Sequence, residues 1–162
     1  MKTALHSLFC RLVIGLAWIA GAAVLVMMLV TCLDVLCRLF SRPLTGAFDI
    51  VRMAGAISAA CAIPYTTAIK GHVAIEYFFH KLGRRGRLLM DAFIRILAML
   101  LFAAISLQSI IYGTALRSTG QVSATLQWPL FWIPYVIAFC CAVTVGVIFY
   151  NLLHPGKEMI KP

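Results

Sequence analysis

The most reactive side chains in this sequence are its six cysteines. A membrane thiol oxidoreductase would use an exposed Cys-x-x-Cys pair, because the thiolate of such a motif is the reactive species. No such pair occurs: Cys32 and Cys37 are too widely spaced, Cys140 and Cys141 are adjacent, and the other two are isolated. We therefore interpret the cysteines as small apolar packing residues and keep a thiol oxidoreductase as the minor alternative.

The remaining candidates for catalysis are also weak. The four histidines lie at predicted helix ends or in loops, so none can face a partner across a bundle core. The sequence has no His and carboxylate cluster at metal spacing, no phosphate-binding glycine loop and no nucleophile with an evident base. The chain is therefore predicted not to be an enzyme, and no catalytic, cofactor-binding, metal-binding or substrate-binding residue is expected in it.

Three pairs of opposite charge share one helix face at i,i+3 or i,i+4 spacing. They are Asp34 with Arg38, Asp49 with Arg52, and Asp91 with Arg95. One interpretation is a set of local salt bridges in the headgroup region, worth about a few tenths of a kcal/mol each. The other is that the first two pairs, together with Arg42, tie two helices together and present a polar surface to an extracytoplasmic partner. Both interpretations stay open at this point.

The composition predicts the secondary structure that carries these residues. Of 162 residues, 63% are hydrophobic and 12% are charged. A soluble domain has about half apolar and about a quarter charged residues, so the sequence is that of a membrane protein. Stretches nearly free of charge predict four spanning helices, since about 20 residues cross a hydrocarbon core of about 30 Å. The predicted spans are residues 12–33, 50–69, 92–116 and 128–152.

The predicted fold is therefore all-α, a single integral membrane domain over residues 1–162. Residues 72–82 mix apolar with charged side chains and predict a short interfacial helix between spans two and three. Pro64 is expected to kink the second span, and Pro129 to lie in the first turn of the fourth. The first span should be retained, because its apolar run exceeds the roughly 7 to 15 residues of a signal-peptide core.

The distribution of basic residues predicts the topology. The formal net charge is +9, and nine Lys and Arg flank the membrane on the side of the termini, against four on the other side. Both termini are therefore expected to be cytoplasmic. The nucleic-acid interpretation of such a charge is disfavoured, because the basic residues are divided among membrane flanks. The turn before span three should contact anionic lipid through Lys81, Arg84, Arg85 and Arg87.

The interiors of the spans carry no Asp, Glu, His or Arg near their middles, which argues against an ion or proton pathway in this chain. Pairs of small residues, Ala17 with Gly21 and Gly55 with Ala59, favour close helix packing. A homo-oligomeric exporter or channel is the main alternative. It would need a polar stripe facing a shared pore, and the available residues are Ser58, Thr66, Thr67, Ser106, Gln108 and Ser109.

Several of these residues also form a recognisable series along the chain. The series is Asp34, Val35 and Arg38, then Pro43 and Asp49, then Gly71, His72, Val73 and Glu76, then Arg84 to Arg87 with Asp91, and finally Ser123, Ala124, Thr125, Leu126 and Pro129. In order and spacing it resembles the small transmembrane subunit of TRAP (tripartite ATP-independent periplasmic) transporters, the DctQ-like family, over about residues 34–153. Asp49 stands where that family commonly has Glu, and Glu76 where it commonly has Asp.

The resemblance implies an accessory subunit of a three-part uptake system in the bacterial inner membrane. A periplasmic binding protein would capture an organic acid, such as a dicarboxylate, keto acid or sialic acid. A large membrane subunit would hold the substrate and sodium sites, and the small subunit would pack on its scaffold. The surface expected to help dock the binding protein consists of Arg38, Arg42, Asp49 and Arg117.

Overall fold

The computed structural model describes residues 2–40, 44–69 and 84–153 of the chain. Four helices account for nearly all of these residues: α1 (Lys2–Leu39), α2 (Ala47–Ala68), α4 (Arg84–Thr119) and α5 (Trp132–Leu153). Each contains a segment long and apolar enough to cross a membrane, which confirms the all-α class and the four spans. The predicted interfacial helix at residues 72–82 lies outside the described residues.

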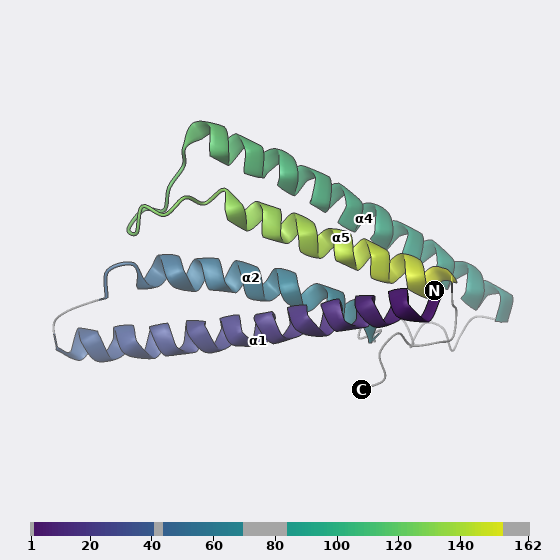
Figure 1. Cartoon of the computed structure of the whole chain (residues 1–162), viewed down its shortest axis with the longest axis horizontal. Helices are drawn as coiled ribbons and strands as arrows, with labels where there is room; N and C mark the ends of the chain where they lie inside the picture. The colour runs from purple at the N-terminus through teal and green to yellow at the C-terminus, as the bar shows by residue number, and fades with distance from the viewer. Residues whose placement is uncertain (1, 41–43, 70–83, 154–162) are drawn as a thin grey trace.

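The helices form two antiparallel hairpins that meet through α2 and α5 (Figure 1). The order across the molecule is therefore α1, α2, α5, α4, and the two central helices are the more enclosed ones. Burial covers 39% of the α2 span and 44% of the α5 span, against 17% for α1 and 6% for α4. We refer to the end of the bundle where α1 ends, α2 begins and residues 120–131 connect α4 to α5 as the loop end.

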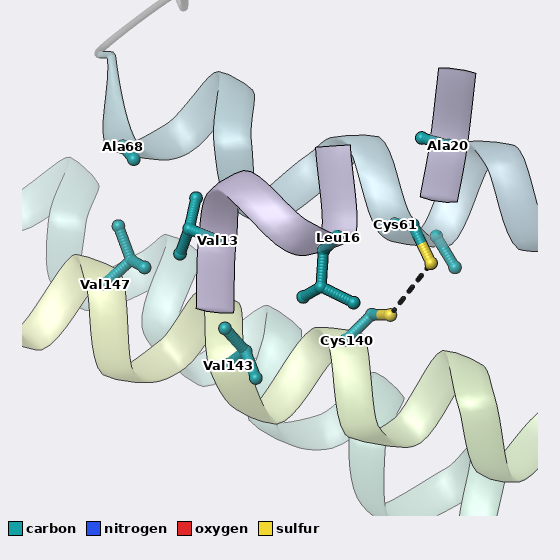
Figure 2. Packing of buried hydrophobic residues seen from close by; sticks show 9 residues of the cluster. Val13, Leu16, Ala20, Cys61, Ala68, Cys140, Val143 and Val147 are labelled. Carbon is teal, nitrogen blue, oxygen red and sulfur yellow. Dashed lines mark hydrogen bonds between the residues drawn. The ribbon is translucent and has the colours of Figure 1, made fainter. Parts of the chain in front are cut away.

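Small and aliphatic side chains make up the core between the hairpins (Figure 2). Its buried members are Val13, Leu16 and Ala20 of α1, Ala60, Cys61 and Ala68 of α2, and Cys140, Val143 and Val147 of α5. The Sγ atoms of Cys61 and Cys140 lie 3.6 Å apart across the α2–α5 contact. These two thiols therefore fill the interface as small apolar groups, as expected of packing residues.

Glycine allows close approach at two helix contacts. A Cβ atom at Gly146 of α5 would lie 3.1 Å from the ring of Phe9 in α1, and one at Gly113 of α4 would lie 3.2 Å from the ring of Tyr135 in α5. The predicted small-residue pairs behave differently from each other. Gly55 packs near Met27, but Gly21 has nothing within 4 Å of its Cβ position and faces away from the bundle.

The start of α5 differs from the prediction. The helix begins at Trp132 rather than at residue 128, so that Pro134 and not Pro129 lies in its first turn. Pro129 instead forms an isolated antiparallel bridge with Val122. The bridge is closed by hydrogen bonds from Ser123 N to Trp128 O and from Leu130 N to Gln121 O, at 2.8 and 3.3 Å. Pro129 fits there because its position requires no N–H donor.

Candidate functional site

The most heavily hydrogen-bonded side chain of the described residues is the carboxylate of Asp49 at the loop end. Asp49 lies in the first turn of α2 and is 5% exposed. Its Oδ2 atom accepts hydrogen bonds from the backbone N–H groups of Thr125 (2.9 Å) and Leu126 (3.2 Å). The same oxygen also accepts from the hydroxyls of Ser123 and Thr125. We call these four residues the Asp49 cluster.

Local backbone structure presents these donors to the carboxylate. The Val122–Pro129 bridge closes residues 121–130 into a compact loop, and Gln127 N donates to Ser123 O at 3.2 Å. Gln127 adopts a positive φ of 51°. This left-handed conformation reverses the chain immediately after Leu126. The turn leaves two successive N–H groups pointing away from the loop, and Asp49 supplies the acceptor that they need.

The loop also packs on the residue that precedes α2. Gly46 is the N-cap of this helix, and its φ of 94° is readily adopted only by glycine. A Cβ atom at Gly46 would lie 2.8 Å from Cγ of Leu126, so the absence of a side chain makes room for that leucine. The loop between α4 and α5 is thus held to the start of α2 by both a polar and an apolar contact.

The position of Asp49 suits a carboxylate for two reasons. A carboxylate in the first turn of a helix interacts favourably with the positive end of the helix dipole. Burial of a charge is tolerated only when hydrogen bonds replace its hydration, and this carboxylate has four. The arrangement is chemically a structural anion site, filled by the protein's own carboxylate.

The second carboxylate at the loop end, Asp34, acts locally. Its Oδ2 atom accepts from Nε of Arg38 at 2.9 Å, which confirms the predicted i,i+4 pair. Its Oδ1 atom accepts from the backbone N–H of Leu44, shortly before α2, at 3.1 Å. The Arg38 side chain is 67% exposed, so its guanidinium remains accessible at the surface of this end.

Comparison with protein-family models gives a match over residues 27–156 to the family described as tripartite ATP-independent periplasmic transporters, DctQ component. The chain belongs to the DctQ family. Comparison with curated proteins gives no match. The matched range contains Asp34, the whole Asp49 cluster, and all of α2 and α4.

Membership of the DctQ family confirms the predicted resemblance and assigns the chain to the small membrane component of a TRAP transporter. The protein is a multi-pass component of the inner membrane. The family is one of transporter components and not of enzymes, in agreement with the sequence-based prediction.

The structure corrects two of the expectations for Asp49. It does not pair with Arg52, which is exposed, because its carboxylate is occupied by the 123–126 loop. Nor can it contact a docked protein directly, since only 5% of it is exposed. Asp49 instead holds residues 123–126 at the start of α2.

The other predicted residues fall into three groups. Arg117 is exposed near the loop end of this DctQ protein, and its guanidinium carbon lies 5.9 Å from the ring centre of Phe131. At this distance the cation is attracted to the face of the ring. Pro129 lies in the loop described above. The rest are outside what the structure describes, wholly or in their side chains: Arg42, Pro43, His72, Glu76, Lys81, Arg84, Arg85, Arg87 and Asp91.

Sequence reasoning included Ser123 and Thr125 in the family pattern but gave them no role. The available signal was an acidic residue at a span entrance together with two hydroxyl residues, two positions apart, in a distant loop. Such a pattern cannot select a partner 74 to 77 residues away along the chain. Only the packing of α5 on α2 brings the two segments together.

Four of the six residues proposed for a polar pore stripe donate to backbone carbonyls. Ser58 donates to Ala20 O of α1 (3.2 Å), and Ser106 donates to Ala138 O of α5 (3.0 Å). Thr66 and Thr67 donate to carbonyls of their own helix. These four hydroxyls are already bonded to backbone, and the observation does not favour the channel alternative.

Proposed function

We propose that this chain is the accessory small subunit of a sodium-coupled TRAP transporter for an organic acid of the dicarboxylate, keto acid or sialic acid class. In this role it packs on the scaffold of the large permease subunit and helps to dock the periplasmic substrate-binding protein. The substrate and sodium sites belong to the large subunit. Membership of the DctQ family supports the transporter assignment, and the geometry of the loop end supports the docking role.

The loop end is proposed to face the periplasm, as the excess of basic residues on the opposite flanks predicts. The observation that carries the docking role is the pair of exposed arginines at this end, Arg38 and Arg117. Each side chain has one contact that restricts its motion. Arg38 is bonded to Asp34, and Arg117 lies against the ring of Phe131. Partly ordered cationic groups of this kind suit a partner that presents carboxylates, because electrostatic complementarity steers the encounter.

The Asp49 cluster supports the same surface by fixing the loop that forms part of it. By holding residues 123–126 to the start of α2, it joins the connection between α4 and α5 to the α1–α2 hairpin. The periplasmic partner would therefore meet one continuous surface instead of two independent loops. Rigid docking surfaces lose less conformational entropy on binding, which favours affinity.

The docking role is tested by charge removal at matched positions. Arg117→Gln and Arg11→Gln each remove one exposed arginine, from opposite ends of the bundle. Both variants are produced with the large subunit and the binding protein, and uptake of the radiolabelled organic acid is measured at several binding-protein concentrations. We expect Arg117→Gln to raise the binding-protein concentration needed for half-maximal uptake about three- to tenfold, and Arg11→Gln to leave it unchanged.

Equal uptake curves for the two variants would remove Arg117 from the docking role. The accessory-subunit role is tested separately, by purifying the tagged chain from membranes that also contain the large subunit. Recovery of the chain only with itself would contradict that role. Replacement of sodium by potassium in the uptake assay tests the coupling ion.

A further inference from the structure

The α4 helix carries a heptad seam on its exposed side. Leu97, Leu101, Ala104, Gln108, Ile111 and Ala115 follow one another at alternating steps of four and three residues, and all six are exposed. This is the a/d spacing with which one helix packs along another. The bundle does not use the seam, because α4 contacts α5 through a different face that contains Gly113 and Ser106. We call these six residues the α4 seam.

Gln108 is the unusual member of the α4 seam. Its amide carries two N–H donors and a carbonyl acceptor, and it has no hydrogen-bond partner among the described residues. It lies about 16 Å along the helix axis from Thr119, at about 1.5 Å per residue, which places it near the middle of a hydrocarbon core of about 30 Å. Lipid tails offer no donor or acceptor at that depth.

The contrast with the other polar residues of the spans is informative. Ser58 and Ser106 both lie at helix contacts and donate to the backbone of a neighbouring helix. Gln108 has a larger polar group and greater exposure, but no neighbour among the described residues to satisfy it. An amide in this environment indicates that a further helix covers it in the assembled protein.

We infer that the α4 seam packs against a transmembrane helix of the large permease subunit, with the Gln108 amide hydrogen-bonded to a polar side chain or backbone carbonyl of that helix. This inference rests on the proposed function. Ala104 and Ala115 lie on either side of Gln108 along the seam and permit close approach of the partner helix. A single polar residue within an apolar a/d seam also fixes the register of the contact.

Site-specific photocrosslinking in the assembled transporter tests the location of the contact. A benzophenone side chain is introduced at Ile111, which is in the seam and 60% exposed, or at Ile110, which is outside the seam and 43% exposed. Ile110 is the matched control, because it lies next to Ile111 in sequence but about 100° away around the helix, on the side of Gly113 and Ser106. We expect an adduct with the large subunit from Ile111 at a yield at least fivefold above that from Ile110.

Two results would overturn the inference: equal yields from the two positions, or an adduct of the chain with a second copy of itself from Ile111. Co-purification of the unmodified chain with the large subunit distinguishes failure of this inference from failure of the proposed function. If the two subunits co-purify without a seam adduct, the proposed function stands and the inference fails. If they do not co-purify, the proposed function itself fails.

Substitution of Gln108 tests the hydrogen bond. Gln108→Leu should weaken association with the large subunit about three- to twentyfold, the effect of one interhelical hydrogen bond, while Ile110→Ala, outside the seam, leaves it unchanged. The isolated Gln108→Leu chain should unfold at the same temperature as the wild type, since the amide has no partner among the described residues. Unchanged association of Gln108→Leu would overturn the role of this amide.

Discussion

The two carboxylates at the loop end, Asp34 and Asp49, have similar sequence surroundings but very different structural roles. Each is followed by an arginine within one helical turn, and each lies at the boundary of a span. Asp34 forms the expected pair with Arg38 and, among the described residues, otherwise accepts from the backbone of Leu44. Asp49 is buried and binds a loop from the other hairpin. Spacing within a helix therefore identifies a possible partner, while tertiary packing decides whether it is used.

The comparison also separates two kinds of stabilisation. The Asp34 contacts join residues that are near one another in sequence and partly exposed, where ion pairs contribute little. The Asp49 contacts join segments 74 to 77 residues apart and are shielded from water. Loss of the acceptor there leaves donors unsatisfied, which costs more than loss of an exposed pair. Substitutions at the two sites are therefore expected to differ in how much they lower the free energy of unfolding.

Asp49→Ala should have the largest effect. Removal of the carboxylate leaves the N–H groups of Thr125 and Leu126 without their acceptor, which costs about 2–4 kcal/mol in the free energy of unfolding. Local opening of the loop should also increase the rate of chymotrypsin cleavage between residues 120 and 131 in detergent. Phe48→Ala is the control, because this neighbour is 76% exposed and its removal should leave the cleavage rate unchanged. Equal cleavage of the two variants would contradict the role of the Asp49 cluster.

Gly46→Ala should have the next largest effect, a loss of about 2 kcal/mol in the free energy of unfolding from backbone strain and overpacking. Alanine is strained at a φ of 94°, and its Cβ atom would collide with Leu126. Thermal unfolding in detergent measures the loss. The double variant with Leu126→Ala separates the two causes, since it removes the collision but keeps the backbone strain. A Gly46→Ala chain as stable as the wild type would show that the loop does not pack on this glycine.

Ser123→Ala tests the contribution of a single hydroxyl donor to the Asp49 cluster. The expected loss is about 1 kcal/mol, smaller than for Asp49→Ala, because three hydrogen bonds to the carboxylate remain. In a double-mutant cycle, Ser123→Ala should have almost no further effect in the Asp49→Ala background. Additive losses in that cycle would mean that Ser123 stabilises the loop without Asp49.

The smallest effect is expected for Arg38→Ala, which breaks the local pair with Asp34. An exposed ion pair contributes about 0.5 kcal/mol or less, and salt screens it. The difference in unfolding temperature between this variant and the wild type should therefore shrink further at high salt, about 1 M. A loss as large as that of Asp49→Ala would erase the distinction between the two carboxylates.

Residue spacing within a helix predicted one charge pair correctly and another wrongly. The i,i+4 pair of Asp34 and Arg38 was correct because a helix fixes the distance between such residues. The pairing of Asp49 with Arg52 was wrong because a distant loop offers that carboxylate more hydrogen bonds than the exposed arginine does. Pro129 was misplaced for a similar reason, since the bridge to Val122 delays the start of α5.

The sequence by itself determined that this is a membrane protein with four spanning helices, because the length and apolarity of a segment decide whether it can cross a bilayer, whatever its neighbours are. The series of residues along the chain also indicated the DctQ family. Only the tertiary structure decided that α2 and α5 are central, that Asp49 holds the α4–α5 loop, and that Gln108 lies on an uncovered face. These properties depend on which helix faces meet, and that is settled by packing between segments far apart in the chain.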